Sequence, residues 1–317
     1  MPIRLSDESV LVKGKPWQKT QVGLALGGGG ARGLAHIGVL EVLAREQIPF
    51  HLIAGSSMGA VVGAAFALFG EIEPVIKIAR GIPDRIPQLE ELQNVNQIPR
   101  QQKHAVSRIV NYIKELYVLN LEATKKGLVN NEDIYPVLED VFGDKTFSDL
   151  KFPFAAVATD LQTGEEMIIR EGSLTRGVLA SMAIPGIFEP VEWNGKILVD
   201  GSVTSLVPIE ACKKLDADLV FAVSAESNTF KRKFERGIDA LFQVDEIRGA
   251  ELNRLKLQQA DFVIRPNIGH VSWSQFAKVN ESIHRGEQAA IISLSGMREL
   301  LVKHERKGIL KCLWPFR

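Results

Sequence analysis

The stretch VGLALGGGGARGLAHIGVLEVL, residues 22–43, decides which fold class this 317-residue chain can adopt. Its first five residues form an apolar run that ends in four glycines, which is typical of a buried strand in a parallel sheet. Apolar residues then recur at helical spacing, at Leu34, Ile37, Leu40 and Leu43. A short buried strand that leads through glycines into a helix predicts the beginning of a β-α-β unit.

The same alternation continues along the chain. FHLIAG at 50–55 predicts a second strand, and MGAVVGAAFALFG at 58–70 predicts a tightly packing helix of small residues. SLTRGVLASM at 173–182 predicts a helix capped by Ser173. Further strands are predicted for FPFAAVATD (152–160), EEMIIR (165–170), KILVDG (196–201), LVFAVSA (219–225) and DFVIRP (261–266). We therefore predict an α/β fold in which a sheet of mainly parallel strands is flanked by helices.

No linker divides the chain, so we predict a single domain made of three parts. Residues 1–21 form a polar N-terminal arm, and residues 22–225 form a core that carries the motifs described below. Residues 226–317 complete the α/β fold and end in a basic, aromatic tail. Prolines interrupt polar helical sequence at about residues 71–135, which predicts a helical insertion in the core. The insertion is either an ordinary helical layer or a lid over a site.

Composition and charge exclude several classes of protein. Lysine and arginine total 38, as do aspartate and glutamate, so no general attraction to nucleic acid is expected. Cys212 and Cys312 form neither a disulfide framework nor a metal-binding pattern, which suits a reducing compartment. Asp7 and Glu8 stand where a signal peptide needs an apolar run, and apolar runs such as 65–69 are too short to span a membrane. We expect a cytoplasmic protein that is soluble or peripheral on a membrane.

The motif Gly55-Ser56-Ser57-Met58-Gly59 fits G-x-S-x-G and lies between a predicted strand and a predicted helix. A sharp strand-to-helix turn exposes the hydroxyl of the middle serine, and the flanking glycines avoid clashes in that strained turn. The helix N-terminus then places backbone N–H groups, such as that of Met58, near the hydroxyl. We predict that Ser57 is a nucleophile. The alternative is that Ser56 or Ser57 merely caps the helix.

A second glycine motif, G-x-G-x-x-G, follows the first predicted strand; its residues are Gly28, Gly29, Gly30, Ala31, Arg32 and Gly33. A dinucleotide site would need an acidic residue after the second strand, where Ala54-Gly55-Ser56 stands instead. Consecutive glycines also let several N–H groups point at one oxygen, so we favour an oxyanion hole over a nucleotide site or a plain tight turn. Arg32 either holds the loop in shape, contacts a phosphate head group, or is simply solvated.

A serine nucleophile needs a base, and Asp200 is the strongest candidate. It ends the run KILV before Gly201, which places it at the C-terminal end of a predicted parallel strand, where sites form in open α/β sheets. The alternative is a turn-forming Asp-Gly pair.

His270 and His284 follow in the chain order that a triad would require, but no motif surrounds them, and His36 is expected to pack on its helix. Asp160 precedes a predicted hairpin turn and is expected to be structural.

Taken together, these motifs identify a family, because the chain resembles the patatin-like phospholipases, acyl-hydrolases with a Ser–Asp dyad. The resemblance rests on GGGGARG (27–33), GSSMG (55–59) and DGS (200–202), in the order that the family has them. ATDLQTGE (158–165) and ASMAIPGIFEPV (180–191) are also similar to bacterial members. The resemblance extends from about residue 22 to about residue 225, and more loosely to about residue 290.

The resemblance implies a lipid acyl-ester hydrolase of the phospholipase A or lysophospholipase type, without a metal or an organic cofactor. Ser57 would be the nucleophile, Asp200 the base, and the glycine loop at 28–33 the oxyanion hole. The family usually has Gly or Ala after Asp-Gly, and here Ser202 stands there, so its hydroxyl can bond to Asp200. The alternatives are a lipid-binding or regulatory member with little turnover and, less favoured, a nucleotide-binding Rossmann-like protein.

The last residues of the chain, KHERKGILKCLWPFR at 303–317, combine basic and aromatic side chains. Basic residues attract anionic lipid head groups, and Trp and Phe favour the interfacial zone. We therefore consider peripheral membrane contact through this tail. The alternative is that Trp314 and Phe316 dock on the surface of the protein itself.

Overall fold

The computed structural model of the protein describes residues 20–85, 131–226 and 237–313. The predicted N-terminal arm, most of the predicted insertion and the end of the tail lie outside these residues. The elements are, in order, β1 (Val22–Leu26), η1 (Gly30–Leu34), α1 (Ala35–Arg45), β2 (Leu52–Ser56), α2 (Met58–Phe69), α3 (Ile72–Arg85), α6 (Asn131–Phe142), η3 (Phe147–Asp149), β3 (Phe154–Asp160), β4 (Glu166–Ile169), α7 (Leu174–Met182), β5 (Val191–Trp193), β6 (Lys196–Asp200), α8 (Ser202–Ser205), α9 (Ile209–Lys214), β7 (Leu219–Val223), α10 (Gly237–Leu257), β8 (Phe262–Ile264), η4 (Phe276–Lys278) and α11 (Val279–Leu313).

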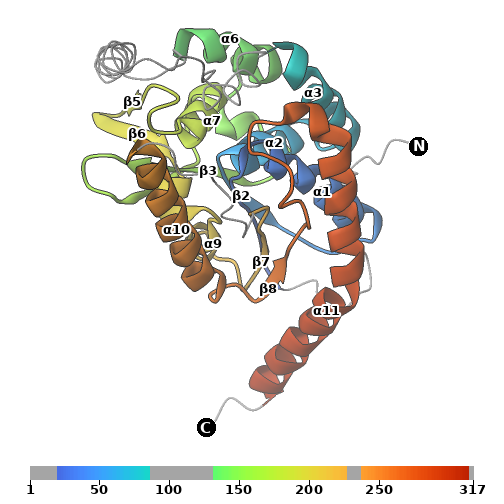
Figure 1. Ribbon diagram of the computed structural model, residues 1–317. Helices are drawn as coiled ribbons and strands as arrows, with labels where there is room; N and C mark the ends of the chain where they lie inside the picture. Colours follow the sequence, from blue (N-terminus) through green and yellow to red (C-terminus); the bar gives the residue numbers. More distant parts are fainter. Residues whose placement is uncertain (1–19, 86–130, 227–236, 314–317) are drawn as a thin grey trace, which may run out of the picture.

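A mixed sheet forms the centre of the molecule, with helices on both of its faces (Figure 1). Its hydrogen-bonded order is β5-β6-β3-β2-β1-β7-β8, and β4 also pairs with β3. The pairs that join β3, β2, β1, β7 and β8 are all parallel. This confirms the predicted α/β fold with mainly parallel strands. The strand β5, which the sequence analysis did not predict, forms an antiparallel pair with β6.

The sheet contains one arrangement that determines the site. Ala158 of β3 pairs with Met167 of β4 and with Asp200 of β6, while its neighbour Val157 pairs with Ser56 of β2 and with a residue of β4. Since β4 occupies one edge of β3, both β2 and β6 must lie along the other edge. The two strands therefore meet end to end, with their C-terminal residues adjacent. The prediction that Asp200 ends a parallel strand was wrong, because β6 runs antiparallel to β3.

The two faces of the sheet are covered by different helices. Leu24 and Leu26 point into a large apolar core that includes side chains of α1, α2, α7 and α11, whereas Ala25 points into a smaller core beneath α9. The helices α1 and α11 lie against each other (Figure 1). Gly38 of α1 and Gly286 of α11 make this close approach possible, since a methyl group on either would overlap a carbonyl oxygen of the other helix.

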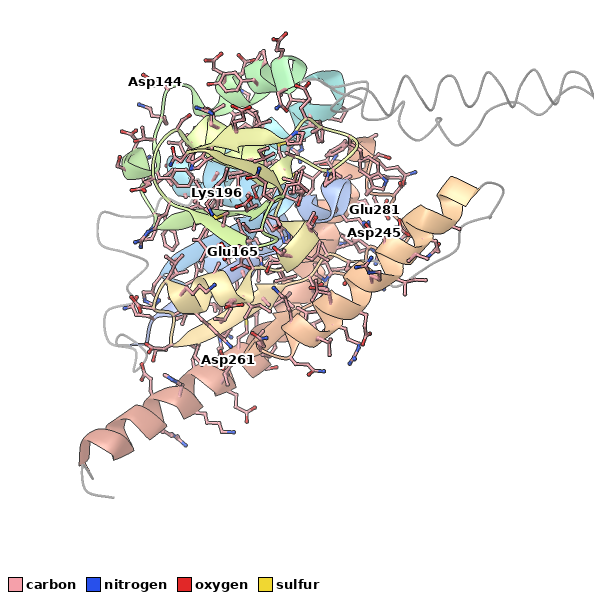
Figure 2. The ribbon with its side chains drawn as sticks, turned by 90° about the vertical axis from the view of Figure 1, so that its left-hand side faces the viewer. Asp144, Glu165, Lys196, Asp245, Asp261 and Glu281 are labelled. Carbon is pink, nitrogen blue, oxygen red and sulfur yellow. The ribbon has the colours of Figure 1, made fainter. Side chains whose placement is uncertain are left out.

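The long helix α11 continues past the end of the sheet in both views (Figures 1 and 2). Among the described helices, none combines the length and the apolar composition that crossing a bilayer requires.

Candidate active site

The predicted nucleophile Ser57 occupies a sharp turn between β2 and α2. Its φ of 53° and ψ of −123° are unusual for a residue with a side chain, and it is 5% exposed. A methyl group on Gly55 would overlap the carbonyl oxygen of Gly59, and one on Gly59 would overlap the main chain at the end of β1. Both glycines are therefore required for the turn, as the G-x-S-x-G motif predicts.

Asp200 is fully buried at the end of β6. Its Oδ1 accepts a hydrogen bond of 2.8 Å from the Ser202 N–H, whereas Oδ2 has no hydrogen-bond partner among the described residues. Burial raises the pKa of Asp200, and the hydroxyl of Ser57 and then the N–H and hydroxyl of Ser202 lower it. Asp200 is thus a buried carboxyl that interacts with the Ser57 hydroxyl and the Ser202 main chain, and its Oδ2 is bound to no other described residue.

The glycine loop lies beside Ser57 and beside Ser202, the residue whose N–H binds Asp200. A methyl group on Gly28 would be 3.1 Å from Cβ of Ser57 and 3.6 Å from Cβ of Ser202. A methyl group on Gly33 would be 2.7 Å from Cβ of Met58. The N–H of Met58 is the first of α2, where helical N–H groups lack a partner within the helix. The structure therefore brings together all three motifs that the sequence analysis identified.

The N–H groups of the glycine loop differ in their availability. Gly28 donates to a main-chain carbonyl at 2.8 Å, and Ala31 donates to the carbonyl of Trp273 at 2.6 Å. The N–H groups of Gly29 and Gly30 make no hydrogen bond within the described part of the chain. Gly29 has a φ of 138° and Gly30 has a φ of 55°. The φ of Gly29 is one that only glycine adopts without strain. Gly29 and Gly30 are therefore the N–H groups of this loop that remain free to bind an oxygen.

Arg32 has a carboxylate near it. Its positive charge lowers the pKa of Glu226, although burial of that carboxyl raises its pKa more strongly. The Nδ2 of Asn253 on α10 donates to Glu226 at 2.5 Å. Arg32 therefore lies near a partly buried carboxyl, and its role at the loop stays a prediction.

His36 and Trp273 support the glycine loop, and the sequence analysis did not identify either role. Nε2 of the fully buried His36 lies 2.6 Å from the carbonyl oxygen of Gly27, the residue before the loop. Burial lowers the pKa of His36 to about 4, so the ring is neutral and donates this hydrogen bond. A methyl group on Gly30 would overlap the Trp273 carbonyl. No sequence signal connects Trp273 with a loop so far away in the chain.

The two candidate triad histidines have other partners. Nε2 of His270 lies 2.6 Å from the carboxylate of Glu281, and Nδ1 of His284 lies 3.5 Å from that of Glu287. Neither contacts the predicted nucleophile or Asp200.

Asp160 forms the turn that the sequence analysis predicted. Its Oδ1 accepts the N–H of Gln162 at 3.0 Å, and its Oδ2 lies 3.3 Å from Nζ of Lys196, which also lies 3.9 Å from Glu165 (Figure 2). The Gln162 N–H and Lys196 hold the pKa of Asp160 below its usual value. Asp160 therefore joins the turn after β3 to β6.

The described residues at this edge of the sheet fit neither a metal site nor a dinucleotide site. Across residues 20–85, 131–226 and 237–313, no three side chains of His, Cys, Asp or Glu come together in a way that could hold a metal ion. The strand β2 ends at Ser56, whose buried hydroxyl has no hydrogen-bond partner among these residues. The position where a dinucleotide site would have its acidic residue is therefore occupied by a serine.

Comparison with known proteins decides the family. The model of the patatin-like phospholipase family matches residues 24–213, which include the glycine loop, the Ser57 turn and Asp200. The chain belongs to the patatin-like phospholipase family. The family match ends before Trp273, whose carbonyl accepts the N–H of Ala31. This support of the glycine loop therefore comes from a part of the patatin-like chain outside the match.

Individual relatives agree with this assignment. An uncharacterized NTE family protein of Mycobacterium bovis is 32% identical over 242 residues, which are 72% of this chain and 59% of the relative. Lysophospholipase NTE1 of Pyricularia oryzae is 26% identical over 206 residues, 65% of this chain and 12% of the relative. The patatin-like chain thus spans only part of the length of these relatives. The structure of VipD from Legionella pneumophila has 15% identity and a TM-score of 0.44, covering 90% of this chain and 67% of that one.

Proposed function

We propose that the protein is a serine acyl-ester hydrolase that acts on lipids, of the phospholipase A or lysophospholipase type. The observation that carries the proposal is the meeting of three groups at one point: the strained Ser57 turn, the buried Asp200, and a glycine loop with two free N–H groups. These groups are a nucleophile, a base and donors for an oxyanion, which together are what acyl transfer to a serine requires.

The proposed reaction has two halves. Asp200 accepts the proton of the Ser57 hydroxyl while Ser57 Oγ attacks the ester carbonyl, and the resulting oxyanion accepts hydrogen bonds from the N–H groups of Gly29, Gly30 and Met58. The tetrahedral intermediate then expels the alcohol, which takes the proton from Asp200. In the second half, Asp200 accepts a proton from water while the water oxygen attacks the acyl carbonyl. The fatty acid is then released, and Ser57 Oγ takes the proton from Asp200, which restores the free serine. Neither half needs a metal or an organic cofactor.

The substrate class follows from the family and from the names of relatives. The fungal relative is called a lysophospholipase, and we extend this substrate class to the present chain. Lipid substrates lie in membranes or micelles, so we propose peripheral membrane contact by a cytoplasmic protein, and no nucleic acid as partner. The membrane role of residues 303–317 stays a prediction, since the side chains from residue 307 onward lie outside the described residues.

The test of this function measures turnover and covalent labelling separately. The purified protein is incubated with lysophosphatidylcholine, with diacyl phosphatidylcholine and with a fluorophosphonate probe. We expect fatty acid release from at least one lipid, and modification of a single serine identified by mass spectrometry. Binding to lipid vesicles without release and without labelling would favour the alternative of a lipid-binding or regulatory protein. Labelling without lipid turnover would indicate a different ester substrate.

Ser202 stands where the family usually has a smaller residue, and we expect it to lower the pKa of the proposed base, Asp200. Its hydroxyl lowers the pKa of Asp200, so Ser202→Ala should raise that pKa and move the acid limb of the plot of kcat/KM against pH to higher pH. Thr204→Val is the control, because the Thr204 hydroxyl bonds to Thr159 at 2.9 Å and not to Asp200. An acid limb that stays in place or moves to lower pH in Ser202→Ala would contradict the prediction.

A further inference from the structure

We infer that Ser181 is a positioning residue that fixes Ser57 relative to Asp200, an inference that rests on the function proposed above. Ser181 is the next-to-last residue of α7 and is fully buried. The helix α7 packs against β3 and β6 (Figure 1). Its C-terminal end therefore lies where β2 and β6 meet.

The end of α7 binds the main chain of both predicted catalytic turns. The carbonyl oxygen of Ser181 accepts the N–H of Ser57 at 3.1 Å and the N–H of Gly201 at 3.3 Å, and the carbonyl oxygen of Ala183 accepts the N–H of Asp200 at 2.9 Å. The last carbonyls of a helix have no partner within the helix and must find one elsewhere. Here they find it in the two turns, so one helix end sets the distance between them.

The side chain of Ser181 adds a second connection. Its hydroxyl donates to the carbonyl of Val157 at 2.6 Å and accepts the N–H of Ser57 at 3.1 Å. A serine within a helix usually returns its hydroxyl to the carbonyl four residues earlier, which would be that of Gly177. The Ser181 hydroxyl instead reaches β3, at the residue that pairs with the end of β2. It therefore connects the Ser57 turn to the sheet.

The Ser57 turn needs such a connection because its backbone is strained. A residue with a side chain holds a φ of 53° and a ψ of −123° only where its surroundings enforce them. Both partners of the Ser57 N–H are atoms of Ser181. Removing the hydroxyl deletes one of these partners and leaves the carbonyl of Val157 without its donor. The turn then loses its side-chain connection to β3, although the chain can still fold.

Displacement of Ser57 would also be detectable at Asp200. Burial raises the pKa of this carboxyl, and the Ser57 hydroxyl, followed by the N–H and hydroxyl of Ser202, lowers it; no charged side chain of the described residues contributes. The Ser202 N–H binds Oδ1 of Asp200 from two residues further along the chain, so this contact does not depend on the position of Ser57. A looser Ser57 therefore raises the pKa of Asp200, which a purely structural loss elsewhere in α7 would not do.

The experiment compares Ser181→Ala with Thr175→Val. Thr175 is an equally buried residue of α7 whose hydroxyl donates to the carbonyl of Gly143 at 3.0 Å, far in the chain from either turn. The pKa of Asp200 is measured by carbon NMR of its carboxyl, which needs no turnover, and kcat and KM are measured with the lipid that the wild type hydrolyses. We expect Ser181→Ala to raise the Asp200 pKa and to lower kcat by about 10- to 100-fold at unchanged KM. Thr175→Val should change neither, although both variants lower Tm.

The two proposals fail in different ways. If the wild type hydrolyses lipid but Ser181→Ala leaves the Asp200 pKa and kcat unchanged, or if Thr175→Val changes them equally, the positioning role is wrong. If the wild type neither hydrolyses esters nor reacts with a fluorophosphonate, the proposed function is wrong. In that case the Asp200 pKa alone tests the positioning role of Ser181. A higher Asp200 pKa in Ser181→Ala but not in Thr175→Val supports the role, and an unchanged Asp200 pKa in Ser181→Ala overturns it.

Discussion

Replacing Ser57 with alanine is expected to abolish fluorophosphonate labelling and to lower kcat for ester hydrolysis by roughly 10,000-fold or more. The reason is that the variant lacks the oxygen that forms the acyl-enzyme, while the Gly55 and Gly59 contacts that shape the turn remain. Alanine also keeps the backbone N–H that bonds to Ser181. The variant should therefore fold with a Tm close to that of the wild type, and circular dichroism and thermal denaturation check this.

Ser56 supplies the control for this experiment. It is the adjacent serine, it is fully buried, and its hydroxyl makes no hydrogen bond among the described residues. Ser56→Ala should therefore keep both labelling and turnover. Labelling that persists in Ser57→Ala would show that another serine is the nucleophile, and loss of labelling in Ser56→Ala would show that the turn depends on both hydroxyls.

The Asp200→Asn variant is expected to lose turnover by about 10,000-fold, since an amide cannot accept the Ser57 proton. It is also expected to be more stable than the wild type at neutral pH. Burial raises the pKa of Asp200, so holding it ionised in the folded state costs free energy above that pKa. The cost falls as the pH drops through the folded-state pKa and the carboxyl takes up a proton. The gain in Tm should therefore be largest at neutral pH and shrink toward acid pH.

Asp160→Asn is the matched control, because its carboxyl has the opposite shift. The Gln162 N–H and Lys196 hold the pKa of Asp160 below its usual value, so its ionised form stabilises the fold and this variant should have a lower Tm at neutral pH. Its turnover should persist. A fully active Asp200→Asn would rule out the Ser–Asp dyad. A His270→Ala variant as inactive as Asp200→Asn would favour a three-residue triad.

The fold could be predicted from local sequence because the decisive signals are local. A buried run before glycines, as at 22–26, and a G-x-S-x-G turn are encoded in consecutive residues, and they predicted the first strands and helices. The direction of β6 could not be predicted in this way. Its sequence fits either direction, and its antiparallel pairing is a contact with β3, a strand well separated from it in the chain.

The site could be predicted to the level of its motifs but not of its supports. The sequence identified Gly28–Gly33 only as a group. Which of its N–H groups are free depends on the partners that Gly28 and Ala31 find, and the partner of Ala31, Trp273, lies far away in the chain. Ser181 belongs to the ASMAIPGIFEPV segment, where nothing in its spacing relates it to Ser57. Such contacts arise only when separate elements pack together, so a single sequence without its structure does not reveal them.

The end-to-end meeting of β2 and β6 on one edge of β3 has a consequence for folding kinetics. Ser57 and Asp200 come from distant parts of the chain, and the elements between them must be in place before the two turns can meet. Bringing distant segments together costs loop-closure entropy before any favourable contact between them can form, so such contacts form late in folding. During refolding, helical structure should therefore return before the Ser57 hydroxyl becomes reactive, which would make that reactivity a late marker of the native state.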